Sequence, residues 1–95
     1  MLEELNPVLH SQLRLAVMSV LMSVGEADFV YLKEKTEATA GNLSVQLDKL
    51  SDAGYITIEK TFEGKRPRTL CCITPVGRSA FEAYVEVLKK YLHLG

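Results

Sequence analysis

Residues 39–63 place a short amphipathic helix directly before an alternating strand, with a glycine between the two. Thr39 stands where an N-cap hydroxyl would accept a hydrogen bond from the first helical N–H groups, and Gly54 stands where a left-handed residue would end the helix. Between them, leucines recur at i, i+4 and i+7, the spacing of one helical stripe: Leu43, Leu47 and Leu50. The pattern predicts a helix with one buried face and a mild, polar outer face, joined directly to a strand.

The segment after this helix is typical of a β-hairpin. "YITIEKTF" alternates, with Ile56, Ile58 and Phe62 on one side, and "RTLCCIT" resumes as a second strand. The intervening "EGKRP" supplies Gly64 for the turn and also Pro67, which donates no ladder hydrogen bond and therefore belongs at an edge or a strand end.

Charge is distributed unevenly along the chain. The formal net charge of −1 argues against nucleic acid, because domains that neutralise phosphates are usually basic. Residues 60–68, "KTFEGKRPR", nevertheless hold four cations and one anion, whereas the remaining 86 residues hold seven cations and eleven anions. The tip of the predicted hairpin is therefore a basic projection on an acidic body.

Helix signals flank this region on both sides. Asn6 and Pro7 are a cap and a first-turn proline, and they predict a helix that runs to about Val24 and stops at Gly25. The string "TPVG" at 74–77 repeats the cap-and-proline signal and opens a last helix that is expected to run to the end of the chain.

The stretch "ADFVYLKEKTEA" begins with β-prone residues and continues as a short helix. Phe29 and Leu32 are expected to face inward, while the charged residues that follow them are solvated: Lys33, Glu34, Lys35 and Glu37. The break before Thr39 then sets up a helix, a turn and a second helix.

Length and composition favour one small domain over residues 1–95. Nearly half of the residues are apolar, which excludes disorder. Glu3 and Glu4 replace the basic start of a signal peptide, and the apolar run from Leu15 to Val24 is too short to span a bilayer. We therefore expect a cytoplasmic protein without a membrane anchor.

Cys71 and Cys72 are adjacent, so in a strand they point to opposite faces and are poorly placed to pair with each other or to bind one metal. We interpret them as reduced, structural thiols, with redox sensing as the alternative that sequence leaves open. The two histidines, His10 and His93, stand alone on terminal segments, so no metal site is expected. Neither paired carboxylates nor a nucleophile with its base can be assembled from these motifs, and we expect a protein that is not an enzyme.

The strings "GNLSVQLDKLSDAGYI", "GKRPRT" and "ITPVGRSAF", in this order, resemble the small winged-helix transcriptional regulators of the MarR-like and ArsR-like superfamily. The resemblance covers almost the whole chain. It implies an α+β, mainly α fold: a winged helix-turn-helix with a three-helix core, a β-hairpin wing and a long C-terminal dimerisation helix. It also implies a homodimer that binds double-stranded DNA, with the third helix in the major groove and the wing on the backbone or minor groove, and it implies no cofactor.

Within that resemblance, the side chains away from the leucine stripe are the candidates for contact with DNA. Amides of the third helix would pair with adenine, its valine would touch a thymine methyl group, and the free N–H groups at its start would meet a phosphate. The same side chains would also suit a solvated helix face. The predicted DNA-binding residues are Thr39, Gly41, Asn42, Val45, Gln46, Lys49, Lys60, Lys65, Arg66 and Arg68.

The first and last helices carry more apolar surface than one three-helix core with a hairpin absorbs. Since a large exposed apolar patch is unusual on a monomer, these helices are expected to pair with their copies across a two-fold axis. The predicted dimer interface comprises Leu13, Val17, Leu21, Phe81, Tyr84, Val85, Leu88, Tyr91 and Leu92.

A second function class fits the same fold. A winged helix also serves as a protein–protein assembly module without DNA binding, and the acidic average charge favours that alternative, whereas the basic tip favours the regulator. The sequence specifies neither the operator, the regulated genes and the direction of control nor a small-molecule effector.

Overall fold

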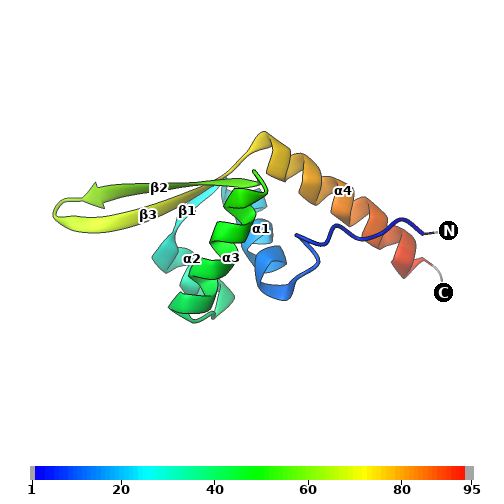
Figure 1. Cartoon of the computed structure of the whole chain (residues 1–95), viewed down its shortest axis with the longest axis horizontal. Coiled ribbons are helices and arrows are strands. Elements are labelled where there is room, and N and C mark those ends of the chain that lie inside the picture. Colours follow the sequence, from blue (N-terminus) through cyan, green and yellow to red (C-terminus); the bar gives the residue numbers. More distant parts are fainter. Residues whose placement is uncertain (1, 94–95) are drawn as a thin grey trace.

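The computed structural model describes residues 2–93, which form four helices and a three-stranded sheet (Figure 1). In chain order the elements are α1 (Gln12–Val24), β1 (Glu26–Asp28), α2 (Phe29–Thr36), α3 (Ala40–Asp52), β2 (Ile56–Glu63), β3 (Arg66–Ile73) and α4 (Pro75–Leu92). This is a winged helix fold with a long C-terminal helix, so the predicted fold class is confirmed.

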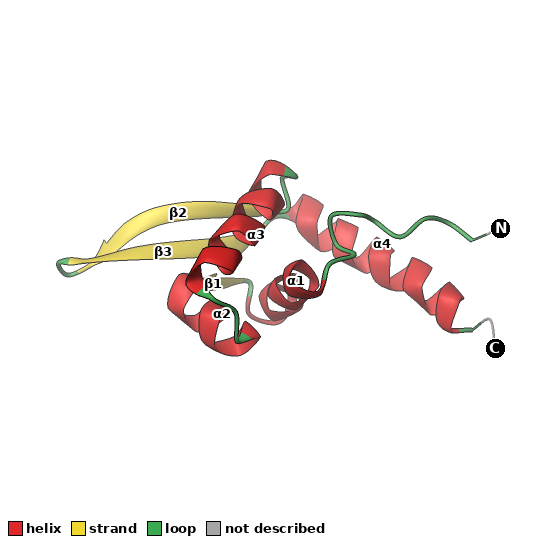
Figure 2. Ribbon diagram, turned by 60° about the horizontal axis from the view of Figure 1, so that its bottom comes forward, coloured by secondary structure: helices red, strands yellow, loops and turns green. Residues whose placement is uncertain are grey.

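The sheet is antiparallel, with the strand order β1-β3-β2. β3 pairs with β2 along its whole length, but β1 covers only the stretch from Leu70 to Cys72. The outer half of the β2–β3 hairpin therefore leaves the body of the molecule and projects as the wing (Figures 1 and 2). Pro67 is the second residue of β3, at the strand end where it was predicted.

Both ends of α3 are fixed by the residues that the sequence singled out. The Thr39 hydroxyl accepts a hydrogen bond from the Asn42 N–H at 3.2 Å. Gly54 has φ +80°, and the N–H of Tyr55 bonds back to the carbonyl of Leu50 at 3.0 Å. This is the Schellman arrangement, which satisfies the last carbonyls of the helix and turns the chain into β2.

The first helix begins at Gln12, so the predicted start at Pro7 is wrong. The side-chain oxygen of Asn6 does act as a cap, accepting from the backbone N–H groups two and three residues on at 2.9 and 3.3 Å. The N–H of Ser11 then turns back to the carbonyl of Leu9 at 2.8 Å, which interrupts the helical ladder after a single turn. The predicted stop is confirmed, because Gly25 ends α1 with φ +82°.

The core lies where α1, α2 and α3 meet one face of the sheet. The leucine stripe of α3 is buried there, as predicted, together with Leu32 of α2. Phe29, which was also predicted to face inward, is partly buried against the core. The other buried apolar side chains are Leu9, Val17, Met18, Leu21, Ala27, Ile56, Cys71 and Tyr84.

α4 begins at the Thr74 cap, whose hydroxyl accepts from the Gly77 N–H at 2.9 Å, and it extends away from the body at the end opposite the wing (Figure 1). The helix ends at Leu92, and residues 94 and 95, to which it was expected to run, lie outside the described residues. The radius of gyration is 14.3 Å. A compact chain of this length would have about 12 Å, so the two projections make the molecule elongated.

Within residues 2–93, no helix has both the length and the apolar content needed to cross a membrane.

Candidate nucleic-acid interface

The outer face of α3 is open to solvent along its length. Gly41, Asn42 and Lys49 are exposed, and Val45 keeps 51% of its surface accessible. These side chains stand opposite the buried leucine stripe, because the helical period separates the two faces. α3 therefore presents amide, aliphatic and cationic groups outward from a rigidly anchored helix.

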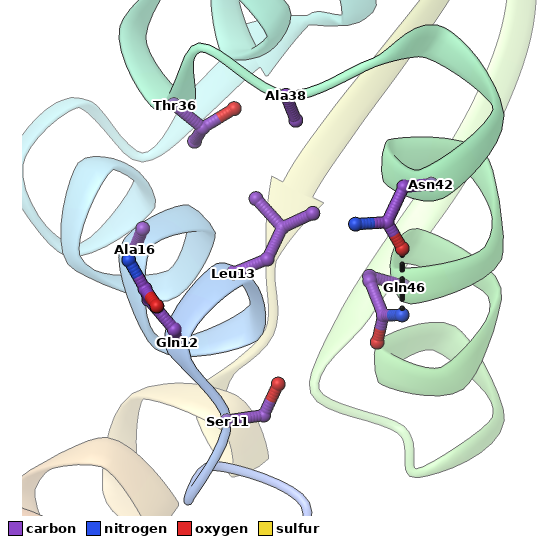
Figure 3. A pocket seen from close by; sticks show the side chains of 8 residues that line it. All are labelled: Ser11, Gln12, Leu13, Ala16, Thr36, Ala38, Asn42 and Gln46. Atoms are coloured by element: carbon purple, nitrogen blue, oxygen red, sulfur yellow. Dashed lines mark hydrogen bonds between the residues drawn. The ribbon is translucent and has the colours of Figure 1, made fainter.

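Gln46 is held by its neighbours instead of projecting freely. Its side-chain oxygen accepts a hydrogen bond from the Arg14 guanidinium on α1, and its side-chain nitrogen donates to the Asn42 side-chain oxygen at 3.1 Å (Figure 3). The Arg14 Nε also donates to the Val8 carbonyl at 2.6 Å. The arginine thus fixes Gln46, and through it the acceptor end of Asn42, while the NH₂ group of Asn42 is turned toward no described acceptor.

A surface cavity of about 380 Å³ lies beside these amides, at the junction of α1, α2 and α3 (Figure 3). Its apolar lining is Leu13, Ala16 and Ala38, and its polar lining includes Asn42 and Gln46. The cavity carries no ionised side chain in its lining, so the groups it offers are amides and hydroxyls.

The four predicted wing cations are all exposed, but they are not equivalent. Lys65 occupies the turn and Arg66 the first position of β3, so both lie at the tip. Arg68 lies nearer the body, where its Nε is 3.3 Å from a carboxylate oxygen of Asp28 at the end of β1. Lys60 points to the other face of the hairpin, opposite Thr69.

The structure corrects part of the predicted dimer interface. Val17 and Leu21 are 0% exposed, and Tyr84 is 4% exposed with its hydroxyl 3.0 Å from Nδ1 of His10. These side chains belong to the core of the chain itself and offer little or no surface to a partner. Leu13 is also partly buried in the chain, packed against its core. The error arises because an apolar stripe looks the same whether it faces its own core or a second subunit.

The remaining predicted residues lie on α4 with part of their surface free. Phe81 and Leu88 touch the core, Val85 and Tyr91 are half-buried, and Leu92 is 73% exposed. A groove of about 490 Å³ runs along this helix, lined by apolar side chains and by Ser79, Glu82 and Glu86; the apolar ones are Met22, Phe81, Ala83 and Val85.

The two cysteines are free, and they face opposite sides of β3 as predicted. Cys71 is buried, and burial raises the pKa of its thiol to about 11. The pKa of Cys72 is also raised, first by burial and then by the Glu26 carboxylate, which accepts a hydrogen bond from its thiol. Neither thiol is therefore an activated thiolate near neutral pH.

Two residues that position the interface were missed from the sequence. Arg14 carried no signal, since a lone cation in an amphipathic helix usually means a solvated side chain. Gly77 was passed over inside a helix signal, yet a Cβ at this position would lie 2.1 Å from the carbonyl oxygen of Tyr55. The absence of a side chain there lets the first turn of α4 pack directly against the backbone of Tyr55, in the turn between α3 and β2.

Comparison with known proteins agrees with this geometry. Residues 13–92 match the family described as "Winged helix DNA-binding domain". The chain is 35% identical over 83 residues to "Uncharacterized protein MJ0432" of Methanocaldococcus jannaschii, covering 86% of this chain and 90% of that protein.

Solved structures share the fold. One is the "transcriptional regulator homologue protein" from Pyrococcus horikoshii OT3, with 27% identity, a TM-score of 0.84, and coverage of 90% of this chain and 84% of that chain. Another is "overoxidized AbfR bound to DNA", with 16% identity and a TM-score of 0.76; the match covers 85% of this chain and 59% of that one, so it is a likeness of fold.

Proposed function

The chain belongs to the winged helix DNA-binding domain family, and from this premise we propose that it is a dimeric, sequence-specific DNA-binding transcriptional regulator. α3 would enter the major groove and the wing would contact the backbone or the minor groove. The family is not one of enzymes, so the function is one of binding. A protein that binds chromosomal DNA works where that DNA is, and we place this one in the cytoplasm.

The observation that carries the proposal is the outer face of α3, anchored by three buried leucines and open on the other side. An α-helix fits the major groove, where amide side chains read adenine and apolar ones meet the thymine methyl group. The NH₂ group of Asn42 has no hydrogen-bond partner within residues 2–93 and Val45 is exposed, so these two are the base-reading candidates. The Gln46 side-chain oxygen already accepts a hydrogen bond from Arg14, and its nitrogen already donates one to Asn42. Gln46 therefore influences base recognition by orienting the Asn42 side chain.

The remaining predicted contacts supply affinity without sequence information. Lys65 and Arg66 at the wing tip, with Lys60 and Arg68 behind them, would meet phosphates. Lys49, in the last turn of α3, would do the same on the major-groove side. Thr39 and Gly41 mark the start of α3, whose N–H groups favour a phosphate.

Dimerisation through α4 is part of the proposal. The groove along α4 and the exposed Leu92 offer apolar surface on this helix. α4 extends away from the body at the end opposite the wing (Figure 1). A two-fold axis there would leave both wings and both α3 helices free, and it would set the two α3 helices about 34 Å apart, as a pseudo-palindromic site requires.

A second candidate, a winged-helix assembly module, is favoured by the charge of the body. Outside residues 60–68 the chain has eleven anions against seven cations. Asp48 is exposed on the outer face of α3, where it would repel phosphate. Fold alone does not decide between the two functions.

Selection of bound duplexes from a random DNA pool tests the proposal. We expect an enriched, two-fold symmetric sequence, and we expect Asn42→Ala to lose about 1–3 kcal/mol on it and to relax preference at one position per half-site. Ser44→Ala, an exposed neighbour, is the control. A pool that stays random after repeated selection would contradict sequence-specific recognition.

A further inference from the structure

A phenylalanine stands exposed near the tip of the wing. Phe62 keeps 71% of its surface accessible, and it pairs across the hairpin with Pro67, which is also exposed. Paired residues of an antiparallel ladder share a face, so the two form one apolar patch, here called the wing patch.

Within residues 2–93, no other segment covers the wing patch, since Phe62 and Pro67 are both exposed. Phe62 lies on the same face of β2 as Ile56 and Ile58, which pack in and against the core. Four residues of strand carry it about 13 Å beyond Ile58, where the hairpin has left the helices (Figure 1). The face of β2 that is buried at the base of the hairpin is therefore exposed near its tip, where it presents an aromatic ring to solvent.

The proposed second subunit does not reach the wing patch either. The molecule is 54 Å long, and the wing and α4 project at its two ends (Figures 1 and 2). A copy that pairs through α4 leaves both wing patches uncovered.

The charges around the wing patch identify a polyanion as its partner. Lys60 lies two residues away on the same face and Lys65 occupies the turn, whereas Arg66 and Arg68 flank Pro67 along β3 with their side chains on the opposite face of the hairpin. Glu63 is the one carboxylate among residues 60–68, and it faces the other way, opposite Arg66. An apolar patch with one cation on its own face, one at the turn and two on the reverse face of a narrow hairpin combines phosphate contact with an element that seeks a non-aqueous surface.

We propose that Phe62, supported by Pro67, is an apolar wedge that enters the minor groove and partly unstacks one base step at each outer flank of the DNA site. This inference rests on the proposed function. The wing cations hold the flanking phosphates, and the phenyl ring replaces water in the groove with base and sugar surface. The wing then reads deformability instead of base edges, and flexible pyrimidine–purine steps are preferred at the wedge position.

The test measures base unstacking by fluorescence. The adenine analogue 2-aminopurine is placed at successive flank positions of the selected duplex. Its fluorescence is quenched by stacking and rises when the base is unstacked. Wild type is compared with Phe62→Ala, with Phe62→Leu, which keeps an apolar wedge, and with Thr61→Ala. Thr61 is the neighbouring residue on the opposite face of the same strand, paired with Arg68.

We expect wild type to raise the fluorescence at one position per half-site, and Phe62→Ala to abolish the rise and to lower affinity about tenfold. Phe62→Leu should keep part of the signal and Thr61→Ala all of it. Replacing the flexible step by a stiff A-tract should weaken wild type several-fold more than Phe62→Ala. Because Phe62 is solvent-exposed, all variants should keep the cooperative thermal unfolding of wild type.

Equal fluorescence and equal affinity for wild type and Phe62→Ala would overturn the wedge and leave DNA binding intact. Loss of dimers in Phe62→Ala, measured by sedimentation, would overturn it in favour of a contact between copies. Failure of wild type to bind any duplex would overturn the wedge and the proposed function together.

Discussion

The guanidinium of Arg14, on α1, donates a hydrogen bond to the side-chain oxygen of Gln46, on α3. The same guanidinium reaches the Val8 carbonyl at 2.6 Å and the more distant Pro7 carbonyl at 3.5 Å. One side chain therefore connects the segment before α1, α1 itself and the helix proposed to read DNA. We therefore expect both the stability of the fold and the presentation of α3 to depend on Arg14.

Arg14→Ala should lower the free energy of unfolding by about 1–3 kcal/mol, because it leaves partly buried acceptors without their charged donor. Urea denaturation at neutral pH and fixed protein concentration measures this. The matched control is Arg78→Ala, whose one backbone contact, to the Met22 carbonyl, is long at 3.5 Å; we expect a change within about 0.5 kcal/mol. Equal stability of Arg14→Ala and wild type would show that the connection is not needed.

The wing cations should act on all DNA sequences alike. Replacing Lys65 and Arg66, at the tip, with alanine should make the slope of log affinity against log salt less negative by about 2, since each phosphate contact contributes about 0.9. Lys89 and Lys90, in the last turn of α4, provide the control pair. A wing variant with the slope of wild type would place the tip outside the interface.

Gly77 should tolerate no side chain. A Cβ would lie 2.1 Å from the Tyr55 carbonyl oxygen, so Gly77→Ala forces backbone apart and should cost about 3 kcal/mol of unfolding free energy. Gly41→Ala has open space around the new methyl group and should gain about 0.5–1 kcal/mol through helix propensity. Thermal and urea unfolding of the two variants should move in opposite directions; two similar shifts would refute the close approach.

Cys71 should make stability fall in alkali. Burial raises the pKa of its thiol from 9.0 to about 11, so between these values the unfolded chain has lost a proton that the native chain retains. The contribution of the Cys71 thiol to the unfolding free energy is therefore complete below pH 9, and it declines as the pH rises toward 11. Cys71→Ala lacks this term, so the stability advantage of wild type over the variant should shrink across that range. Parallel stability curves would contradict it.

The dimer prediction uses Val85, which lines the groove on α4. Leu88 is a poorer target, because it also packs against the core of its own chain. Val85→Asp should yield folded monomers that bind DNA more weakly, and sedimentation at micromolar concentration measures this. Val30→Asp, on α2, removes an equally apolar side chain that is 63% exposed, and it should remain dimeric. A wild-type protein that sediments as a monomer would contradict the dimer.

Local signals in the sequence predicted the elements well, because each has a nearby physical cause. Thr39 and Thr74 accept the N–H groups that a cap must satisfy, and Gly25 and Gly54 take positive φ angles that stop helices. The start of α1 failed for a tertiary reason. Asn6 caps one turn, but burial of Leu9 in the core draws the chain out of helix before Ser11 restarts it.

The site was less predictable, because periodicity identifies an apolar face without identifying what covers it. Val17 and Leu21 face their own core. Phe62 lies on the same face of β2 as the core residue Ile56, yet it is exposed because it stands near the tip of the wing. The Arg14–Gln46 contact joins residues 32 apart in sequence, and the Gly77–Tyr55 approach depends on how α4 meets the turn between α3 and β2. Such relationships exist only after the chain has folded.

The most direct measurement of the central claim is a salt titration of binding to two duplexes, one carrying the selected sequence and one carrying the same bases scrambled. For a regulator that uses wing cations on phosphates and α3 on bases, both affinities should fall linearly with log salt. The selected duplex should stay at least about 10³-fold tighter at physiological salt. Absence of binding to either duplex at low salt would contradict the account and favour the assembly module.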